Sequence, residues 1–567
     1  MKNKSVRLTD VLKSRLQVKK TSSASDLLLP RKKEAFSSEC FPMWKNLGKN
    51  RKQSGGSDRK TEERTLAYAQ KLSRMVQCDT TSYPFSDIHP AEEQTARFRE
   101  YHHVLETLFP LVHRYLEKKD LDGNLLYVWR GKSSEKPIVL MGHQDVVPAA
   151  GPSLKGLKGT TTAVRHGRTS SGGSPLSDGQ TGGPLADGQT VDPLADGQTE
   201  SPLSDGQTGG PLSDGWIRPP FSGCIADGKV WGRGSVDTKC SCMSFLQAIE
   251  ELLAEDFLPP QDIYISSSCT EEWGGPGCNA IIDELKRRKV RPWLVCDEGG
   301  GIYTDPMPGV RGRAAMIGIA EKGRANVRFI ARGKGGHAST PQRHSPIARL
   351  AGFVCSIEKH SPFRCRMESE TQAMLEALAP ASILPVRLIF QNLHFFRLPI
   401  EKLTPGLNGR AAAMLGSTIT FTMASGSEAC NVFPQEASLG ANLRFAHHQD
   451  MEESLAVIRK LAKKHGLEME VLDAAPCTRK ADLQGSAYRY VEETIRKIFP
   501  GIITSPFVLT AATDAAFYDS ICDSCIRFAP IVYGPEEKNG IHGINEALRY
   551  DCLPDAVDFY KRLIAGV

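Results

Sequence analysis

The sequence predicts an α/β fold in which a mostly parallel sheet forms one domain and a smaller α+β domain is inserted into it. Two observations support this prediction. Over residues 137–296, short apolar runs alternate with helical patterns, which is typical of a parallel sheet covered by helices. From Gly318 the order becomes strand, helix, strand, strand, helix, strand, and beyond Gln484 the first pattern returns. We therefore expect the second domain to interrupt the first.

The individual elements follow from apolar runs and their period. For the sheet domain they are a helix at 66–72, a strand at 137–141, a helix at 239–253, a strand at 262–267, a helix at 278–288, a strand at 293–296, a helix at 487–498, strands at 505–509 and 525–529, and a helix at 553–564. The inserted domain ends with a helix at 451–464 and a strand at 468–472. The expected boundaries are 63–317 and 476–567 for the sheet domain, and 318–475 for the inserted domain.

The basic character of the chain lies at its N-terminal end. The chain has a net charge of +6, but residues 1–62 hold 16 Lys/Arg against 6 Asp/Glu, so the remainder has a net charge of −4. This segment is rich in Ser and Lys and shows no helical or strand period, so we expect a disordered tail. RNA or acidic-lipid binding by the tail is the alternative interpretation.

Residues 150–215 form an insert of a different character. A nine-residue unit reading Pro-Leu-Ser/Ala-Asp-Gly recurs there, with its prolines at Pro175, Pro184, Pro193, Pro202 and Pro211. A calcium-binding β-roll would need several oxygen ligands in each unit, whereas only one Asp recurs here. The few apolar residues cannot bury a core, so we expect a flexible surface loop.

Two features of the whole chain bear on its location. No stretch approaches the roughly 20 apolar residues of a membrane-spanning helix, and the N-terminus lacks the apolar block of a signal peptide. The 15 cysteines are scattered without a repeating frame, which favours reduced thiols over a disulfide scaffold. We expect a soluble, cytoplasmic protein that does not contact a membrane.

Side chains that bind metals stand in five places, at the ends of apolar strands or in Gly-rich loops. These places are Gly142-His143-Gln144-Asp145, Gly234-Ser235-Val236-Asp237, Thr270-Glu271-Glu272-Trp273, Val295-Cys296-Asp297-Glu298 and Ile541-His542-Gly543. Any one of them is more often a surface pair or a solvated helix start. Together, two histidines and three carboxylates suit two zinc ions that share a carboxylate about 3.5–4 Å apart.

Two acidic positions are expected to act beside the metal ligands. Asp145 follows His143 by two residues on the same side of an extended strand, so it can fix the second ring nitrogen of that histidine. In Glu271-Glu272 the neighbouring side chains point in different directions. One of them can therefore bind metal while the other acts as general base and passes the proton to the leaving nitrogen.

In this order, the motifs resemble those of the acetylornithine deacetylase, succinyl-diaminopimelate desuccinylase and aminoacylase/carboxypeptidase family of di-zinc hydrolases. The resemblance covers residues 65–567 without the insert, and segments 528–535 and 541–546 are most similar to the Gly-Xaa carboxypeptidase and N-acyl-amino-acid hydrolase branch. It implies a zinc-exopeptidase-like catalytic domain with a lid and dimerisation domain. It also implies a homodimer paired through the lid, and two Zn²⁺ per subunit for which Co²⁺ or Mn²⁺ can substitute.

By position, the resemblance assigns a role to each residue of the motifs. The implied ligands are Asp237 as the bridge between the ions, His143 and Asp297 for one ion, and Glu272 and His542 for the other. Glu271 is then the general base. Asp297 is preferred to its neighbour Glu298 because it directly follows the apolar strand, although relatives differ in which acid ends that strand.

The inserted domain is expected to supply three more residues. In relatives the counterpart of His337 reaches across a dimer interface and stabilises the oxyanion of the tetrahedral intermediate. A loop histidine that caps the following helix is the alternative interpretation. Asn431 and Arg444 match lid positions that bind substrate, and the Arg444 fork can grip a carboxylate. Segment 512–516 lacks the basic residue that is usual near the substrate pocket of the family.

The sequence therefore predicts a di-zinc hydrolase that cleaves an amide bond next to a free carboxylate. Its substrate would be a small peptide, as for a carboxypeptidase or dipeptidase, or an N-acyl amino acid. The main alternative is an inactive family member that keeps the fold and serves as a binding or scaffold protein, which the intact ligand set disfavours. Nucleic-acid binding through residues 1–62 is a third, less favoured hypothesis.

Overall fold

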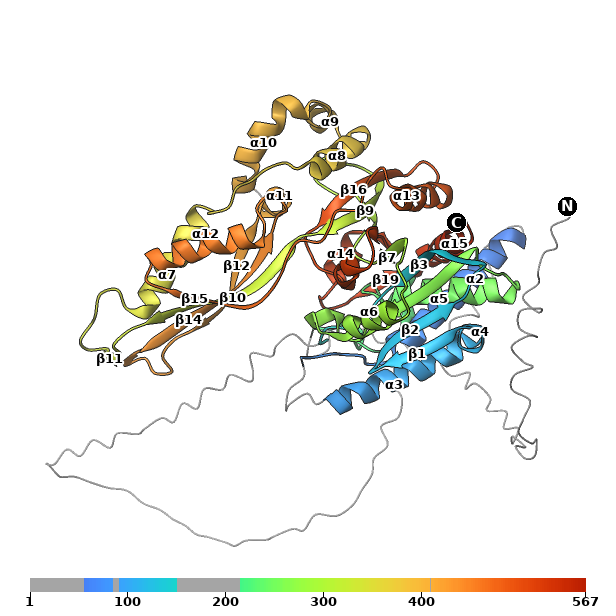
Figure 1. Cartoon of the computed structure of the whole chain (residues 1–567), viewed down its shortest axis with the longest axis horizontal. Coiled ribbons are helices and arrows are strands. Elements are labelled where there is room, and N and C mark those ends of the chain that lie inside the picture. Colours follow the sequence, from blue (N-terminus) through green and yellow to red (C-terminus); the bar gives the residue numbers. More distant parts are fainter. Residues whose placement is uncertain (1–55, 85–90, 150–214, 408, 567) are drawn as a thin grey trace, which may run out of the picture. The chain divides into compact units, whose positions relative to one another are not determined.

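The computed structural model describes residues 56–84, 91–149, 215–407 and 409–566 (Figure 1). The repeat insert at 150–214 and the chain before residue 56 lie outside these ranges, and so do the predictions made for them. The chain divides into two compact units, residues 1–149 with 218–567 and residues 150–217, and every element named below belongs to the first.

A ten-stranded sheet contains the strands predicted from the long apolar runs (Figure 1). In spatial order its strands are β1 (Glu117–Leu121), β2 (Asn124–Trp129), β6 (Gln261–Ser267), β3 (Ser133–Met141), β7 (Leu294–Asp297), β17 (Cys525–Arg527), β9 (Arg313–Glu321), β8 (Gly301–Thr304) and β18 (Val532–Tyr533), with β16 (Ile503–Leu509) paired to β9. The central strands β6, β3, β7 and β17 run parallel. The predicted α/β fold with a mostly parallel sheet is confirmed.

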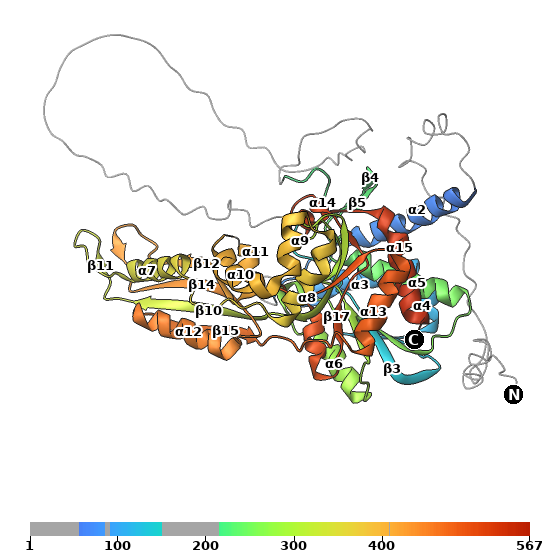
Figure 2. The same cartoon turned by 90° about the horizontal axis from the view of Figure 1, so that it is seen from above.

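Helices cover both faces of this sheet (Figures 1 and 2). One face carries α2 (Gly56–Val76), α3 (Ala91–Leu108), α4 (Pro110–Tyr115), α5 (Lys239–Ala254), α13 (Ser486–Ile498) and α15 (Leu553–Ala565), and the other carries α6 (Gly277–Arg287) and the 3₁₀ helix η7 (Asp514–Ser520). Along β3, Ile138 and Leu140 belong to the first core, while Val139 and Met141 belong to the second. This two-residue period buries β3 on both sides, which explains its continuous apolar run.

A separate antiparallel sheet lies in the segment predicted as the inserted domain. Its strands are, in spatial order, β12 (Thr418–Ser425), β14 (Glu436–Phe445), β10 (Gly323–Arg332) and β15 (Glu468–Ala475). Helices α7 (Pro346–Lys359) and α12 (Met451–Lys464) pack on one face around Phe329, Phe353 and Ile458. A two-stranded ribbon, β11 (Gly336–His337) with β13 (Val432–Phe433), belongs to the same segment. Strand β9 of the large sheet continues to Glu321, so we call residues 322–475 the lid segment.

Four helices of the lid segment were not predicted. They lie between α7 and β12 and are α8 (Ser369–Leu378), α9 (Leu384–Gln391), α10 (Leu393–Leu407) and α11 (Gly409–Leu415), with the 3₁₀ turn η6 (Ala379–Ala381) after α8. Helix α8 packs against β16, and Met374 and Leu378 share a core with Met316 and Phe507 of the large sheet. Helix α8 of the lid segment therefore packs on strands of the large sheet.

The remaining elements are short. They are the three-stranded sheet β19 (Ala547–Arg549), β5 (Lys229–Trp231) and β4 (Ile225–Ala226), helix α14 (Pro535–Gly540), and the 3₁₀ turns η5 (Glu271–Trp273) and η8 (Tyr550–Cys552). Helix α2 begins at Gly56, so helical structure starts inside the segment 1–62 that the sequence assigns to a tail. An ion pair of 3.1 Å between Arg59 and Glu63, one turn apart, stabilises this start. Within the described ranges, no helix is both long and apolar enough to cross a membrane.

Candidate metal centre

The candidate site lies where neighbouring strands of the large sheet end. Strands β6, β3 and β7 are adjacent and parallel, so their carboxyl ends meet at one edge. His143 comes two residues after β3, Glu271 opens η5 after β6, and Glu298 directly follows β7. Two more distant segments join them, because Asp237 precedes α5 and His542 follows α14.

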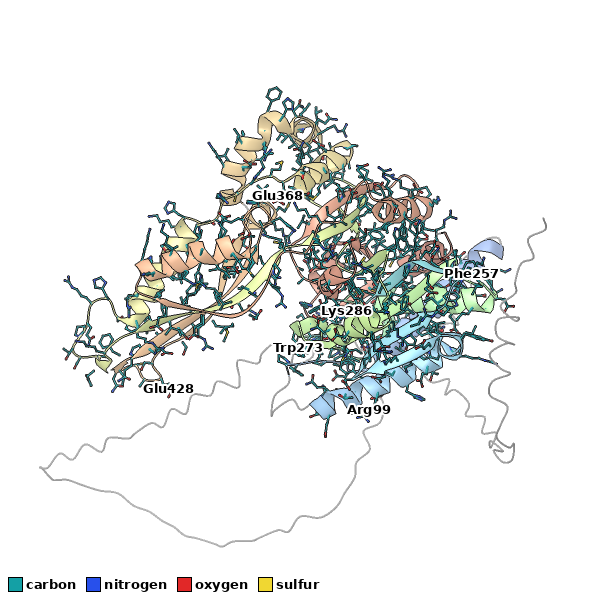
Figure 3. All side chains as sticks on the ribbon, in the orientation of Figure 1. Arg99, Phe257, Trp273, Lys286, Glu368 and Glu428 are labelled. Carbon is teal, nitrogen blue, oxygen red and sulfur yellow. The ribbon has the colours of Figure 1, made fainter. Side chains whose placement is uncertain are left out.

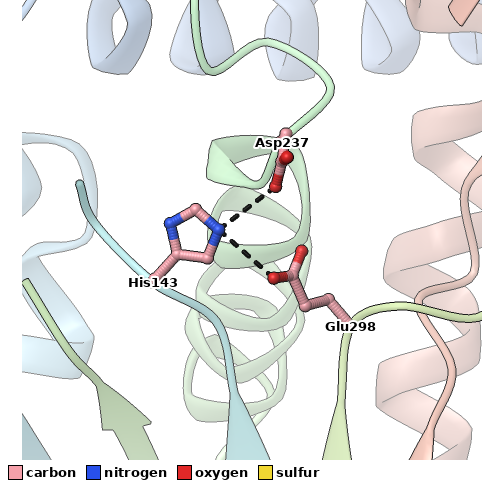
Figure 4. Close-up of side chains that lie close together, drawn as sticks. All are labelled: His143, Asp237 and Glu298. Carbon is pink, nitrogen blue, oxygen red and sulfur yellow. Dashed lines mark hydrogen bonds and ion pairs between the residues drawn. The ribbon is translucent and has the colours of Figure 1, made fainter. Parts of the chain in front are cut away.

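The first group of possible ligands surrounds His143. Its Nε2 lies 3.1 Å from Asp237 Oδ1 and 3.2 Å from Glu298 Oε1 (Figure 4). One donor atom from each of the three residues lies within 4.8 Å of the others. The histidine ring is 2% exposed and the Glu298 side chain 13% exposed, so a cation here would be largely shielded from water.

The second group shares Asp237 with the first. His542 Nε2 lies 3.2 Å from Asp237 Oδ2 and 2.9 Å from Glu272 Oε2. The two oxygens of Asp237 thus face different histidines, which is the arrangement of a carboxylate that bridges two ions. Four of the five predicted ligand positions, His143, Asp237, Glu272 and His542, are brought together.

The structure does not bring the fifth predicted ligand, Asp297, into this cluster. Its Oδ2 accepts a hydrogen bond from the Ala515 backbone N–H at 2.9 Å, and its Oδ1 accepts one from the Glu298 N–H at 2.9 Å. Glu298 occupies the place beside His143 instead. On this geometry Glu298, rather than Asp297, is the candidate ligand beside His143: the last residue of β7 contacts η7, and the next residue turns into the cluster.

Asp145 ties the two halves of the cluster together. The backbone carbonyl of Asp145 lies 2.8 Å from His143 Nδ1, and its carboxylate lies 3.5 Å from the same nitrogen. The carboxylate also accepts hydrogen bonds from the backbone N–H groups of Glu271 and Glu272, at 3.2 and 3.1 Å, and from Ser82 Oγ at 2.6 Å. Asp145 therefore contacts both the His143 ring, most closely through its backbone carbonyl, and the turn that carries the two glutamates.

Sequence reasoning missed two residues that hold the Asp237 loop. Glu546 is fully buried, and its Oε1 accepts hydrogen bonds from the backbone N–H groups of Val236 at 2.8 Å and Asp237 at 3.2 Å. Its Oε2 pairs with Arg233 Nη1 at 2.8 Å. The only sequence signal was the position of Glu546 four residues after His542. A buried acid in that position both orients Asp237 and fixes the segment that follows His542.

Crowding of carboxylates in a buried place shifts their proton affinities. Burial raises the pKa of Glu272 and that of Glu298 to about 7 each, and it raises the pKa of Glu271 well above its usual value. Burial would also raise the pKa of Asp237, but hydrogen bonds with the two histidines lower it. Hydrogen bonds to Asp237 and Glu272 raise the pKa of His542 to about 10. The shifts reflect several carboxylates that lie close together in a buried place, where positive charge on a neighbouring group is favoured.

Glu271 lies beside the cluster without belonging to either ligand group. Its Oε2 is 3.9 Å from His143 Nε2, and its side chain is only 14% exposed. By contrast, Glu272, its neighbour in η5, reaches His542. The two glutamates thus point to different places, as their adjacent positions predict.

The lid residues of the predicted site do not touch the cluster. His337 is exposed on β11, where its Nδ1 lies 2.7 Å from Ser339 Oγ. Asn431 is also exposed, next to β13, and its backbone carbonyl accepts a hydrogen bond from the Ala338 N–H at 2.9 Å. Arg444 lies on β14, and its Nη1 is buried without a hydrogen-bond partner among the described residues.

The donor set fits a pair of divalent cations such as zinc. Each group offers one imidazole nitrogen together with carboxylate oxygens, and these are the usual ligands of zinc in hydrolases. Glu272 Oε1 is buried and finds no hydrogen-bond partner within the described part of the chain. A buried carboxylate oxygen without a hydrogen-bond partner can be satisfied by a bound cation.

A parallel sheet with imidazole and carboxylate ligands at its strand ends is the architecture of a metal-dependent hydrolase. The chain belongs to Peptidase family M20/M25/M40, whose profile matches residues 205–566. This membership confirms the family resemblance of the motifs and the hydrolase class that they imply.

Comparisons with known proteins agree with this assignment. "Probable carboxypeptidase S-like 2" of Dictyostelium discoideum is 27% identical over 508 residues, which cover 88% of this chain and 85% of that protein. Human N-fatty-acyl-amino acid synthase/hydrolase PM20D1 is 31% identical over 354 residues, which cover 62% of this chain and 70% of that protein.

Solved structures share the fold at low sequence identity. The M20 family metallo-carboxypeptidase Sso-CP2 from Sulfolobus solfataricus has a TM-score of 0.56 at 16% identity, covering 88% of this chain and 98% of its own. Human carnosine dipeptidase 1 has a TM-score of 0.54 at 13% identity, covering 89% and 98%.

Proposed function

We propose that this family member is a two-zinc hydrolase that cleaves an amide bond next to a free carboxylate. The observation that carries the proposal is the split of Asp237, whose two oxygens face His143 and His542 at 3.1 and 3.2 Å. The ligands in this proposal are Asp237 as the bridge, His143 with Glu298, and His542 with Glu272. Co²⁺ or Mn²⁺ would serve in place of Zn²⁺ with the same donors.

The chain's own residues supply the proton transfers. When bound, the ions polarise the scissile carbonyl and lower the pKa of the attacking water. Glu271 takes the proton from that water, because it is the one glutamate of the η5 pair that is left outside the ligand groups. It then returns the proton to the leaving nitrogen. Asp145 is a positioning residue, since it holds the backbone of Glu271 and Glu272.

Two arginines, of which Arg324 also pairs with Asp473 at 3.4 Å, are proposed to bind the substrate carboxylate. Arg324 and Arg444 are opposite each other in the pairing of β10 with β14. The Arg324 guanidinium packs against Gly274, because a Cβ added to that glycine would lie 2.9 Å from Arg324 Nη2. Gly274 directly follows η5. Arg444 Nη1 has no hydrogen-bond partner among the described residues. A carboxylate between these arginines would supply the missing acceptor and would stand next to the catalytic turn.

The substrate class follows from this placement together with the relatives. Both a peptide with a free C-terminus and an N-acyl amino acid carry the required carboxylate beside an amide. The relatives' names cover both classes, since one is a probable carboxypeptidase and another an N-fatty-acyl-amino acid synthase/hydrolase. Asn431 is proposed to contact the substrate from the lid segment.

A homodimer paired through the lid segment completes the proposal. His337 is exposed and, among the described residues, makes no hydrogen bond or ion pair with the metal cluster. Met423 on β12 and Val432 on β13 are large apolar side chains that are 73% and 47% exposed. Pairing would cover them, and it would let His337 donate to the oxyanion in the other chain's site.

The cytoplasmic location predicted from the sequence is kept as part of the proposal. The scattered cysteines, which suit a reducing compartment, support it. Imaging of a tagged full-length chain in cells tests the location.

Metal analysis and a substrate screen test the function. We expect up to two divalent ions per chain, loss of activity on chelation, and recovery on adding zinc. Dipeptides and N-acyl amino acids are screened against the same compounds with an amidated C-terminus, which should be poor substrates. A folded protein that binds no ion, or one that binds ions but hydrolyses none of these compounds, would favour the alternative of an inactive binding or scaffold protein.

A further inference from the structure

Helices α9 and α10 carry a cluster of exposed apolar side chains. In Figure 3, side chains project outward from these two helices, beyond the start of α8 where Glu368 is labelled. Residues 383–403 hold seven of the 14 large apolar side chains that are exposed in the described part of the chain, and we call them the α9–α10 surface. A concentration of this kind marks a site of interaction. The most exposed members are Leu384, Phe395, Leu398 and Leu403.

Other apolar residues anchor the same two helices. Phe390 near the end of α9 and Leu393 at the start of α10 are buried, in a core that also contains Met374 and Leu378 of α8. The exposed side chains therefore belong to helices that are already packed on one side. A helix that is apolar on its other sides as well is normally covered there too. In the described part of a single chain, the α9–α10 surface has no such cover.

A hollow lined by arginines adjoins this surface. Arg364, Arg366 and Arg397 line it together with Leu398, which is also a member of the α9–α10 surface. Arg366 is exposed and makes no ion pair within the described residues. Arg364 pairs with Glu453 at 2.6 Å, but both side chains are about half exposed, so water weakens this pair. Guanidinium groups match the geometry of phosphate oxygens, so the hollow suits a phosphate group.

Positive charge exceeds negative charge along the α9–α10 surface. Residues 383–403 contain three basic residues, Arg387, Arg397 and Lys402, against the single acid Glu401, which gives a net charge of +2. Glu401 pairs with Arg397 at 2.9 Å and accepts a hydrogen bond from the Met367 N–H at 2.8 Å. Lys402 is exposed and forms no ion pair with any described residue. The charge that no ion pair neutralises is therefore positive, and an anionic surface would complement it.

We propose that the α9–α10 surface binds the face of a membrane that contains anionic phospholipids. Its Leu and Phe side chains enter among the acyl chains, and the arginine hollow holds a lipid phosphate, as in other basic amphipathic helices that lie on bilayers. A protein partner would also cover the apolar side chains. A phospholipid matches the hollow beside Leu398 more fully, because it carries phosphate and acyl chains in one molecule.

This inference does not depend on the proposed hydrolysis. The sequence predicts no membrane contact because it contains no spanning run of apolar residues, but a helix that lies on a bilayer surface needs no such run. It needs an exposed apolar side with basic residues around it, and the structure shows both on α9 and α10.

Co-sedimentation of the full chain with vesicles tests the assignment. Vesicles of phosphatidylcholine alone are compared with vesicles of phosphatidylcholine and phosphatidylserine in equal parts. We expect binding mainly to the anionic vesicles, and weaker binding as salt is raised. The double variant Phe395→Ser with Leu398→Ser should lower the partition coefficient by about tenfold or more, because it removes the apolar contact. Arg366→Glu should lower it by about tenfold as well, because it reverses a charge in the hollow.

Two matched controls make the same chemical changes elsewhere. Leu472→Ser alters an apolar side chain on β15 that is 54% exposed, and Arg291→Glu alters an exposed arginine, before β7, that makes no ion pair with a described residue. Both should bind the anionic vesicles as the wild type does.

Three results would overturn the inference. The full chain may bind neither kind of vesicle. Binding that persists in both surface variants would belong to the basic residues 1–62 instead. A change of oligomeric state in the Phe395→Ser, Leu398→Ser variant, measured by analytical ultracentrifugation and without any loss of vesicle binding, would make this surface a contact between two copies of the chain.

Discussion

At the scale of single residues, Asp237 is the most constrained group of the site. Its two oxygens face different histidines, and its backbone N–H is held by Glu546. A side chain with this many partners cannot shift toward one histidine without leaving the other. The loop that carries Asp237 therefore helps to position the proposed bridging carboxylate. The glutamates that lie near it can differ sharply in their roles.

Glu271 and Glu272 provide the sharpest contrast. Glu271→Ala should keep both ions and substrate affinity while kcat falls by about 10²–10⁴-fold, which is the usual contribution of a general acid–base group. Glu272→Ala should lose or weaken one ion, because Glu272 Oε2 lies 2.9 Å from His542 Nε2. Steady-state kinetics and metal analysis of both variants check this. If the two variants failed in the same way, the division of roles would be wrong.

Asp297 and Glu298 form a second adjacent pair. Glu298→Gln should weaken the ion beside His143, since Glu298 Oε1 lies 3.2 Å from that ring. Asp297→Asn should retain both ions, because its carboxylate is hydrogen-bonded to the Ala515 and Glu298 N–H groups. Metal content after dialysis against a weak chelator distinguishes them. Metal loss in Asp297→Asn alone would restore the preference derived from the sequence.

The sequence could predict the cluster but not this choice, and the reason is physical. Position at the end of an apolar strand shows that an acid reaches the site edge. It cannot show which of two adjacent acids turns inward, because that depends on a hydrogen bond donated by Ala515, 218 residues further along the chain. Glu546 escaped prediction for the same reason, since its partners at 233–237 are distant in sequence.

At the scale of elements, a buried ion pair joins three segments where the lid segment begins. Glu321 ends β9, Arg527 ends β17, and their side chains meet at 2.7 Å with almost no exposure. Thr513, before η7, donates to the same carboxylate through its N–H at 3.0 Å and its Oγ1 at 2.9 Å. Removal of one charge would leave the other buried and unpaired.

Arg527→Met should therefore lower the free energy of unfolding by about 3–5 kcal/mol. The matched control is Arg332→Met on β10, whose ion pair with Glu436 is about half exposed and should contribute no more than about 1 kcal/mol. Urea unfolding of both variants measures the difference. Equal shifts would mean that the buried pair contributes no more than a surface pair does.

Two of the helices that were not predicted, α9 and α10, lack the usual signals of a helix in their sequences. Helix α10 contains Pro399 in its interior, and proline there normally ends a helix. The apolar residues of α9 and α10 are also largely exposed, as Leu384 at 67% and Phe395 at 71% show. Apolar residues recur with a helical period when one face of a helix is buried. Because these helices are largely exposed, their sequences show no such pattern. By contrast, strands such as β3, which are buried on both faces, have continuous apolar runs that the sequence shows clearly.

At the scale of the whole molecule, the proposed dimer makes a prediction that does not depend on its detailed geometry. Glu271→Ala and His337→Ala should each be nearly inactive alone. A purified pair with one chain of each kind should regain about half of the wild-type activity, because one of its two sites has both intact residues. Differently tagged, co-expressed chains provide the pair. Activity no higher than that of the single variants would place His337 in its own chain's site, or outside catalysis.

The two histidines of the cluster also have a topological consequence. They are roughly 400 residues apart, so ions shared through Asp237 would close a very long loop of chain. The entropy lost on closing a loop grows only as the logarithm of its length, at about 0.6 kcal/mol for each doubling. An insertion of the size of residues 150–214 lengthens this loop by much less than a doubling, so it adds only a fraction of that roughly 0.6 kcal/mol. The length of the repeat can therefore change with little effect on the entropy of closing the loop.

Thermal unfolding tests this consequence. Chelation should lower Tm, because ions that bind only the folded chain stabilise it. Deleting residues 150–214 should change neither the Tm of the metal-loaded protein nor the size of the fall on chelation by more than a degree or two, since the closure entropy is nearly unchanged. A much larger fall in one of the two proteins would show that the insert contributes to holding the ends of this loop together.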